Sequence, residues 1–452
     1  MSNDRGKRFV RRSGLTKGSW RRRLGALLVG SLASISLFST DGAGLTLEQA
    51  VQLALTRNER SRAAEMRVSA AEARVDKART LFLPDLIATG NYTRRAYQTF
   101  RVVEGQRFPI QRYNVWSPRG VLTFNLYDPS AAPLYRQVRR ENQATRLTAA
   151  NDKRLLAFEA ANAFLTALSM EQVLEAARRR LEFAKRSLAD TRARFEAQLV
   201  SSNDVTRAEL ELATAERELT RTQGGMETAS LQLGYLLNTK VEGPIEMPVS
   251  LLQAAATPPD PGTGVVAEAL KRRQDVAAIR QHTDALRAAA SEPLLRFLPS
   301  LRMTGQYTMT NESGLSGRNR DWLIGLALTW NMYDGGERFA DRAERQALAD
   351  AADLDAQALE RRVDVELNTA LVVLANEQAA VKQAGVAADV ARTNMEQATE
   401  LYRQGLASAL EVADANVRLF EAEVALVRER YGLTLAYLDW RAALGLDPLG
   451  KE

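Results

Sequence analysis

Four short stretches of the chain alternate between apolar and polar residues, a pattern typical of β-strands whose two faces meet different surroundings. Two of them cover residues 86–93 and 121–126, and the other two cover residues 298–308 and 324–332. The apolar positions of the second and fourth stretches include Leu122, Phe124, Leu126, Leu328, Trp330 and Met332, and the polar positions between them include Thr123, Asn125, Thr329 and Asn331. We therefore predict four strands, each with one apolar face, and a loop over residues 94–118.

Much longer stretches have apolar residues spaced three and four apart, which is the spacing of an amphipathic helix. They run from Asp128 to Phe195 and from Asp334 to Tyr402. About 67 residues at 1.5 Å each make a rod of roughly 100 Å, which no ordinary globular domain contains. The sequence thus predicts coiled-coil or tube-wall elements, and a shorter helix that begins at Thr46 and continues until Pro84.

The same order of elements occurs twice. The phrase at residues 83–93 recurs at residues 298–308, an offset of 215, and the phrase at residues 122–128 recurs at residues 328–334. Such internal repetition predicts two copies of one module. The boundaries that we expect are residues 44–238 for the first repeat, residues 239–264 for an irregular proline-rich connector, and residues 265–452 for the second repeat.

Both rods end at a matched turn, at residues 195–205 and 402–412. Glycine is the residue that most readily ends a helix in a left-handed conformation, and Gly405 fits that position. A Ser with an acidic residue three positions later forms a capping box, which starts a new helix. The residues of these two boxes are Ser201 with Asp204 and Ser408 with Glu411. Each rod is therefore expected to turn back into a return helix.

The first 43 residues carry most of the positive charge. They contain nine Lys and Arg against two Asp, so the rest of the chain has a net charge of −1 although the whole chain has +6. Because the positive charge lies in this leader and not in the rest of the chain, the basic composition does not indicate a nucleic-acid partner. A basic start followed by the apolar run from Leu24 to Phe38 and small residues predicts a cleaved export signal over residues 1–43. An uncleaved membrane anchor is the alternative.

Four strands cannot close into a barrel, because the smallest membrane barrels have about eight. An open sheet edge also cannot lie in lipid. Two chains would supply eight strands and three would supply twelve, and a long tube favours the wider choice because eight strands leave little lumen. A soluble coiled coil with added hairpins is the alternative. In a membrane barrel, Leu122, Phe124, Leu126, Leu328, Trp330 and Met332 would face lipid, and Thr123, Asn125, Thr329 and Asn331 would line the lumen.

No residue pattern points to catalysis. The chain has no cysteine and a single histidine, His282. We find no Ser-His-Asp set, no phosphate-binding loop and no metal-ligand spacing. We therefore expect no enzyme activity, no cofactor and no metal site. An enzyme or binding module on a long helical scaffold is the alternative, and no motif supports it.

Together these motifs closely resemble the TolC-like outer-membrane factors. The resemblance rests on Leu-Pro-x-Leu before a strand that ends in Tyr-Thr, a second strand that ends in Tyr-Asp before Gly335-Gly336, and the turn with Gly405, Ser408 and Glu411. It covers residues 45–446, in both repeats. In the first repeat Asp128-Pro129-Ser130 replaces the glycine pair, and Pro293 interrupts the helix before the third strand.

The resemblance implies a mixed, mainly α fold: a homotrimer with a twelve-stranded β-barrel in the outer membrane of a Gram-negative bacterium and an α-helical tunnel across the periplasm. It implies a periplasmic adaptor and an inner-membrane pump as partners of a passive exit duct. Asp414 falls where the family places an acidic constriction ring, with Glu411 and Asp204 as further candidates. For the last two, helix capping alone is an equal alternative. Whether the duct serves small toxic solutes or type I protein secretion stays open.

Overall fold

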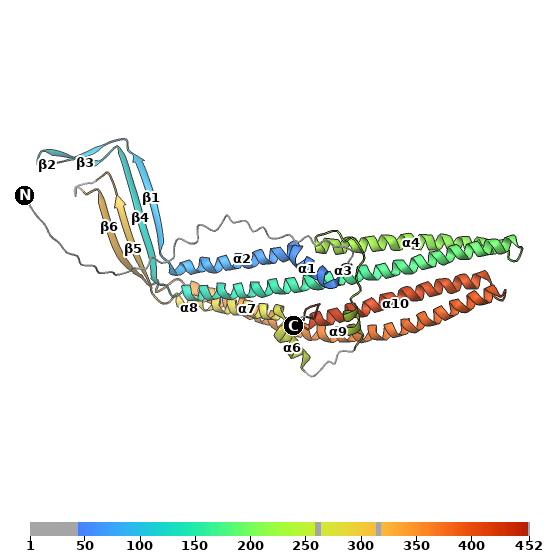
Figure 1. The fold of residues 1–452 in the computed structure, drawn as a ribbon. Helices are drawn as coiled ribbons and strands as arrows, with labels where there is room; N and C mark the ends of the chain where they lie inside the picture. The colour runs from blue at the N-terminus through green and yellow to red at the C-terminus, as the bar shows by residue number, and fades with distance from the viewer. Residues whose placement is uncertain (1–43, 258–263, 313–317, 451–452) are drawn as a thin grey trace, which may run out of the picture. The chain divides into compact units, whose positions relative to one another are not determined.

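The computed structural model describes residues 44–257, 264–312 and 318–450, which fold mainly into helices with two antiparallel sheets (Figure 1). The predicted export signal, residues 1–43, lies outside the described residues. Among the described residues, no helix is both long enough and apolar enough to cross a lipid bilayer.

Two very long helices confirm the predicted rods. Helix α3 (Ala131–Glu196) has 66 residues and helix α9 (Glu337–Arg403) has 67. Each turns back into a return helix, α4 (Ser202–Leu237) or α10 (Ala409–Ala443), and packs along it (Figure 1). Each repeat therefore contains a long helical hairpin.

The helix predicted from Thr46 to Pro84 is wrong as a single element. It is broken at Asn58 into α1 (Leu47–Arg57) and α2 (Glu59–Arg79), and a short 3-10 helix, η1 (Thr80–Phe82), follows. Asn58 ends one helix and caps the next, because its side-chain oxygen accepts a hydrogen bond from the Arg60 N–H at 2.9 Å. Its Nδ2 donates to the Leu236 carbonyl at 2.9 Å, which holds the break against α4.

The second repeat is broken at the matching position. Helices α6 (Val265–Arg272) and α7 (Gln274–Ala290) meet at Arg273, which lies 215 residues after Asn58. The buried Arg273 guanidinium pairs with Asp275 at 2.7 Å and with Glu366 of α9 at 2.5 Å. Burial alone would raise the pKa of Asp275, but the hydrogen bond and charge of Arg273 outweigh it and hold that pKa below its usual range.

The connector between the repeats is less irregular than expected. It contains helix α5 (Val249–Ala256), which follows Pro248. Leu251 and Ala255 are buried, so the apolar side of this short helix packs on the larger helices. Residues 258–263 of the connector lie outside the described part of the chain.

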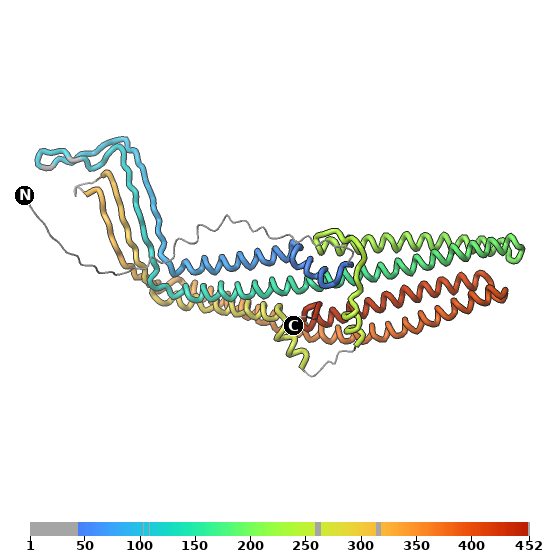
Figure 2. The backbone as a smooth tube through the Cα atoms, viewed as in Figure 1, coloured from blue at the N-terminus to red at the C-terminus, as the bar shows by residue number. Residues whose placement is uncertain are grey.

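The main sheet has the strand order β1-β4-β5-β6, with every neighbouring pair antiparallel. Its strands are β1 (Asp85–Arg94), β4 (Asn114–Tyr127), β5 (Ser300–Met309) and β6 (Arg320–Thr329). Figure 2 shows that the first repeat contributes β1 and β4, and the second contributes β5 and β6. Within this sheet, the two repeats therefore meet at the β4–β5 pair.

Two predicted boundaries are wrong. The expected loop over residues 94–118 contains a second sheet, a hairpin of β2 (Thr99–Val103) and β3 (Gln106–Gln111), and β4 already begins at Asn114. The fourth strand ends at Thr329, because Thr329 pairs with Ser300, the first residue of β5. Trp330, Asn331 and Met332 therefore follow the strand, and the Trp330 indole donates to the Phe297 carbonyl at 3.0 Å.

The largest apolar core lies where α1, α3, α4 and α10 meet. Phe164, Leu165 and Leu168 of α3 are fully buried with Leu233 of α4 and Leu438 of α10. Alanines fill the space between these larger side chains, and such small residues let the helix axes approach closely. The four buried alanines of this part of α3 are Ala157, Ala160, Ala161 and Ala167.

A buried ionic cluster holds the junction between helices and sheet. The short helix α8 (Glu292–Leu295) precedes β5, and Pro293 stands in its first turn, as the sequence suggested. The Glu292 carboxylate is only 2 % exposed and accepts hydrogen bonds from Arg296 at 2.7 Å and from Arg345 of α9 at 2.9 Å. Because a buried carboxylate without partners is costly, these arginines fix the start of β5 on α9.

Candidate functional site

The helix turns far from the sheet have the local geometry that the sequence predicted. The Ser201 hydroxyl accepts from the Asp204 N–H at 3.4 Å, and the Asp204 carboxylate accepts from the Ser201 N–H at 3.0 Å. Ser408 and Glu411 form the same two bonds, both at 3.3 Å. Both capping boxes are therefore confirmed, and each starts a return helix.

Each turn also has one residue in a left-handed conformation, at the matching position. Gly405 has a φ of +76°, and its counterpart in the first repeat, Gln198, has a φ of +58°. A residue other than glycine rarely adopts this conformation, since its Cβ approaches the following carbonyl. The two turns therefore share one backbone path although only one contains glycine.

Asp414 lies on an exposed part of α10, in the turn after the capping box. Its carboxylate accepts a hydrogen bond from Arg418 Nε at 2.8 Å, one helical turn later. Glu411 and Asp204 instead bond to their own helix starts. These three carboxylates thus have different partners in the single chain, and a constriction role stays a prediction for each of them.

A contact between the two helical hairpins was not predicted. The Arg194 guanidinium of α3 lies 4.5 Å from the centre of the Tyr402 ring of α9 and donates to the Tyr402 carbonyl at 3.3 Å. Arg194 Nε also donates to Asp190 at 3.1 Å. No sequence motif identifies this pair, because the residues lie 208 positions apart and belong to different repeats.

Beside this contact, a groove of about 510 Å³ separates the two hairpins. Arg180, which is buried, pairs with Glu211 at 2.9 Å on one side and lies 5.1 Å from the centre of the Phe420 ring on the other. Asn416 of α10 also lines the groove and is 5 % exposed, and its Nδ2 has no hydrogen-bond partner among the described residues. The groove therefore borders a buried ion pair and a buried amide nitrogen that has no partner.

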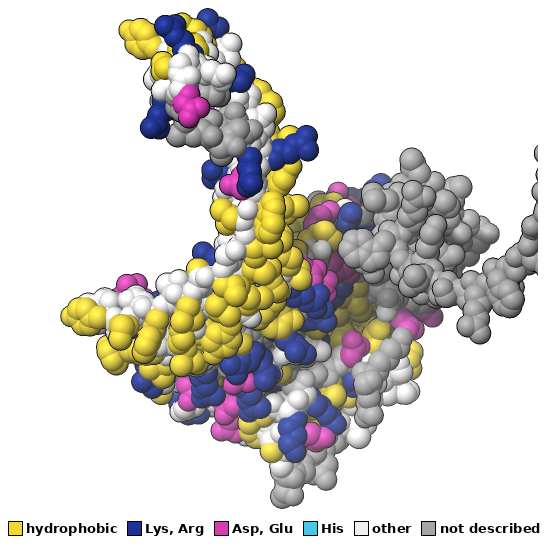
Figure 3. All heavy atoms as spheres, turned by 90° about the vertical axis from the view of Figure 1, so that its left-hand side faces the viewer, with side chains coloured by type: hydrophobic (Ala, Val, Ile, Leu, Met, Phe, Trp, Pro, Cys, Tyr) yellow, Lys and Arg dark blue, Asp and Glu magenta, His cyan; other side chains and the backbone are white. Residues whose placement is uncertain are grey.

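The strand register separates the main sheet into two faces, because directly paired residues of antiparallel strands share a face. One face, here called the apolar face, consists of Leu86, Ala88, Gly90, Tyr92, Trp116, Pro118, Gly120, Leu122, Phe124, Leu301, Met303, Gly305, Tyr307, Trp322, Ile324, Leu326 and Leu328. The opposite face, here called the polar face, includes Thr89, Asn91, Ser117, Arg119, Thr123, Asn125, Arg302, Thr304, Gln306, Thr308 and Thr329. Figure 3 shows the apolar side chains gathered along one side of the strands.

The predicted two-sided pattern is correct for most of the candidate strand residues. Leu122, Phe124 and Leu328 lie on the apolar face, and Thr123, Asn125 and Thr329 lie on the polar face. Leu126 does not follow the pattern, because the register shifts between Asn125 and Tyr127 and leaves it without a partner. Trp330, Met332 and Asn331 lie beyond the end of β6.

The apolar face is strongly exposed in one chain. Ile324, Leu326 and Leu328 of β6 are 69 %, 66 % and 68 % exposed. Soluble proteins rarely leave so large a contiguous apolar surface uncovered, and such a surface marks an interface or a membrane contact. This face is therefore a functional surface.

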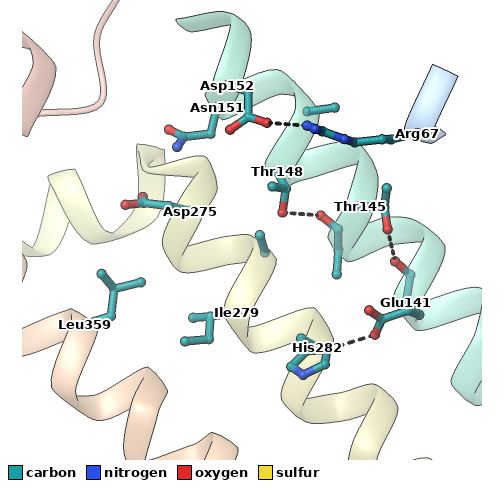
Figure 4. A pocket seen from close by; sticks show the side chains of 13 residues that line it. Arg67, Glu141, Thr145, Thr148, Asn151, Asp152, Asp275, Ile279, His282 and Leu359 are labelled. Atoms are coloured by element: carbon teal, nitrogen blue, oxygen red, sulfur yellow. Dashed lines mark hydrogen bonds and ion pairs between the residues drawn. The ribbon is translucent and has the colours of Figure 1, made fainter. Parts of the chain in front are cut away.

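The only histidine lies in a cavity of about 400 Å³ between helices of both repeats (Figure 4). His282 of α7 bonds to the Glu141 carboxylate of α3 at 2.9 Å, and Arg67 of α2 lies 3.7 Å from Asp152. Within the described ranges, no group of three or more His, Cys, Asp or Glu side chains is placed to hold a metal ion. The cavity lies between packed helices, and its lining residues do not form a catalytic arrangement.

Comparison with known proteins gives the same family in both repeats. Residues 50–239 and 265–446 match the model of the outer membrane efflux protein family. Outer membrane protein TolC of Escherichia coli is 24 % identical over 447 residues, which cover 94 % of this chain and 86 % of that protein. Nodulation protein T of Rhizobium leguminosarum bv. trifolii is 22 % identical over 395 residues, which cover 85 % of this chain and 82 % of that protein.

A solved structure has the same fold. The open state of the MtrE outer membrane channel of Neisseria gonorrhoeae superposes with a TM-score of 0.75 at 18 % identity, and the match covers 90 % of this chain and 91 % of that one. The family match spans both helical hairpins and all four strands of the main sheet. The chain therefore belongs to the outer membrane efflux protein family, and its place is the outer membrane.

Proposed function

We propose that three copies of the chain form an exit duct in the outer membrane, as the outer part of a tripartite export system that conducts its substrates passively. The observation that carries this proposal is the four-stranded main sheet, which has two open edges and one exposed apolar face. The family, one of outer membrane efflux proteins, supports a channel without enzyme activity.

The open edges lie on β1 and β6, the outer strands of the sheet. In lipid, their unpaired N–H and C=O groups would each cost several kcal/mol. Joining β6 of one copy to β1 of the next removes these edges, and three copies of four strands give a twelve-stranded barrel. In this barrel the apolar face meets lipid, and the polar face lines the lumen.

The long hairpins continue the duct on the periplasmic side. Since α3 and α9 both begin directly after a strand of the main sheet, three copies would surround one axis with helices. The turns at the other end then form the periplasmic aperture. Asp414 of three copies would form a ring of carboxylates there, with Glu411 and Asp204 close by.

The same end is suited to docking a periplasmic adaptor, which connects the duct to an inner-membrane pump. Leu199 and Leu406 stand at matched positions of the two turns and are 74 % and 73 % exposed. The groove between the hairpins is lined by charged side chains of the helices that lead into these turns, among them Arg186 of α3 and Glu400 of α9. An adaptor with an apolar tip and a polar helical flank would complement both features.

The proposal is tested with protein purified in mild detergent and then inserted into a planar bilayer. We expect a trimer by native mass spectrometry and stable single-channel conductance. Asp414→Asn should weaken cation selectivity without lowering the melting temperature. Asp389→Asn is a matched control, because Asp389 is an exposed carboxylate paired with an arginine on α9.

Two results would contradict the proposal. A monomer that keeps its full β signal in circular dichroism would exclude the shared barrel. If the trimer conducts but Asp414→Asn changes only the melting temperature, Asp414 is helix surface and does not form the aperture.

A further inference from the structure

At the end of the sheet away from the helices, both strand pairs carry an aromatic pair on the apolar face. Tyr92 of β1 pairs directly with Trp116 of β4. Tyr307 of β5 pairs directly with Trp322 of β6. The four rings are between 45 % and 70 % exposed, and Tyr and Trp are the residues that prefer the boundary between membrane and water.

The next pair on the same face contains an arginine in each case. Arg94 pairs with Asn114 two positions beyond Tyr92, and Arg320 pairs with Met309 two positions before Trp322. Neither guanidinium has an acidic partner among the described residues. Each arginine therefore lies directly past the aromatic pair, where the apolar face ends, and keeps its hydrogen-bond donors available.

The surrounding segment is positive as well. Residues 94–112 contain five arginines and one acidic residue, Glu104. Only Arg95 of these five forms an ion pair within the described residues, with Glu312. Figure 3 shows Lys and Arg side chains clustered at this end of the sheet, which is the upper end in the view. This local charge contrasts with a body whose net charge is near zero.

We propose that Arg94 and Arg320 bind the phosphate groups of anionic lipid headgroups in the outer leaflet. The inference rests on the proposed function, because it needs the apolar face to meet lipid. A guanidinium presents a planar fork of donors that matches two oxygens of a phosphate group. The aromatic pairs set the depth of the boundary, and the arginines then stand at the height of the headgroups.

The opposite face provides a contrast within the same strands. Arg119 of β4 and Arg302 of β5 lie on the polar face, and the Arg302 guanidinium already donates to Asn125 at 3.0 Å. Arg119 and Arg302 do not share a face with the aromatic pairs. In the proposed barrel, they point to water. They should therefore not contribute to lipid binding.

The test measures lipid binding to the full trimer in neutral detergent at low ionic strength, by native mass spectrometry. The probe is lipid A with two phosphate groups, compared with the same lipid after phosphatase treatment. Arg94→Gln and Arg320→Gln should each weaken binding of the phosphorylated lipid roughly fivefold, since one cation near an anionic surface contributes about that factor. Together they should weaken it by a factor on the order of 25, because the sites are independent.

Arg119→Gln is the matched control and should bind the phosphorylated lipid as the unchanged protein does. Inorganic phosphate at millimolar concentration should not displace the lipid. The proposal is overturned if the double variant binds like the unchanged protein, if the dephosphorylated lipid binds equally well, or if inorganic phosphate competes. Should the double variant fail to assemble, the two single variants decide the question by the same criterion. Conductance in a zwitterionic bilayer should survive in all variants, so failure of this inference leaves the duct intact.

Discussion

At the residue scale, the two helix turns provide a comparison inside one chain. Gln198 and Gly405 both adopt a left-handed conformation, but only glycine does so without a steric cost. Nothing lies within 4 Å of the position that a Cβ on Gly405 would take, so its replacement would suffer from backbone strain alone.

We predict that Gln198→Gly stabilises the protein by about 0.5–1 kcal/mol and that Gly405→Ala destabilises it by a similar amount. The melting temperature of the trimer in detergent, followed by circular dichroism at 222 nm, should move in opposite directions for the two variants. Gln198→Ala is the control and should change little, since it keeps a Cβ in the same conformation. A lower melting temperature for Gln198→Gly would show that the glutamine side chain makes a contact that compensates the strain.

Residues whose partners lie close in sequence were predicted well. The capping boxes at Ser201 and Ser408 depend only on a spacing of three, which the sequence displays directly. The break at Asn58 was not predicted, although Asn is a preferred N-cap and an acidic residue follows it. By contrast, Arg194 and Tyr402 meet only through the packing of two hairpins, and no local pattern reveals them.

At the element scale, the alternation predicted the faces of the strands but not their ends. A strand ends where its neighbour ends, so β6 stops at Thr329 because β5 begins at Ser300. The alternation of apolar and polar residues continues past this point with Trp330 and Met332. The predicted strand was therefore too long. Likewise, the shift at Leu126 arises between β4 and β5 and cannot be seen in β4 alone.

The two faces of β6 predict opposite effects of the same substitution. Arginine at Leu328 should destabilise the barrel by roughly 2–4 kcal/mol if this position lies near the middle of the bilayer. Arginine at Thr329, on the polar face, should be tolerated because its charge would meet water in the lumen. The yield of heat-resistant trimer extracted from membranes measures both. Equal yields for the two variants would show that the assignment of lipid and lumen is wrong.

At the scale of the whole molecule, repetition predicted two similar halves but not how they join. Within each half, the strands of the main sheet pair with each other, β1 with β4 and β5 with β6. The halves share a continuous sheet only through β4 and β5. This central pairing could not be read from the sequence, because strand order in an antiparallel sheet depends on contacts between distant segments.

That central pairing also has a consequence for how the protein folds. Arg302 and Asn125 are partners across β4 and β5 although 177 residues separate them. Closing such a long loop is entropically costly and slow, whereas hairpins that need only local contacts form early. We therefore expect the helical hairpins and the two outer strand pairs to be protected first in pulsed hydrogen exchange, and the β4–β5 amides last. Early protection of β4–β5 would contradict this order. If the expected order holds, each repeat forms its own strand pair first, and the pairing of β4 with β5 completes the main sheet last.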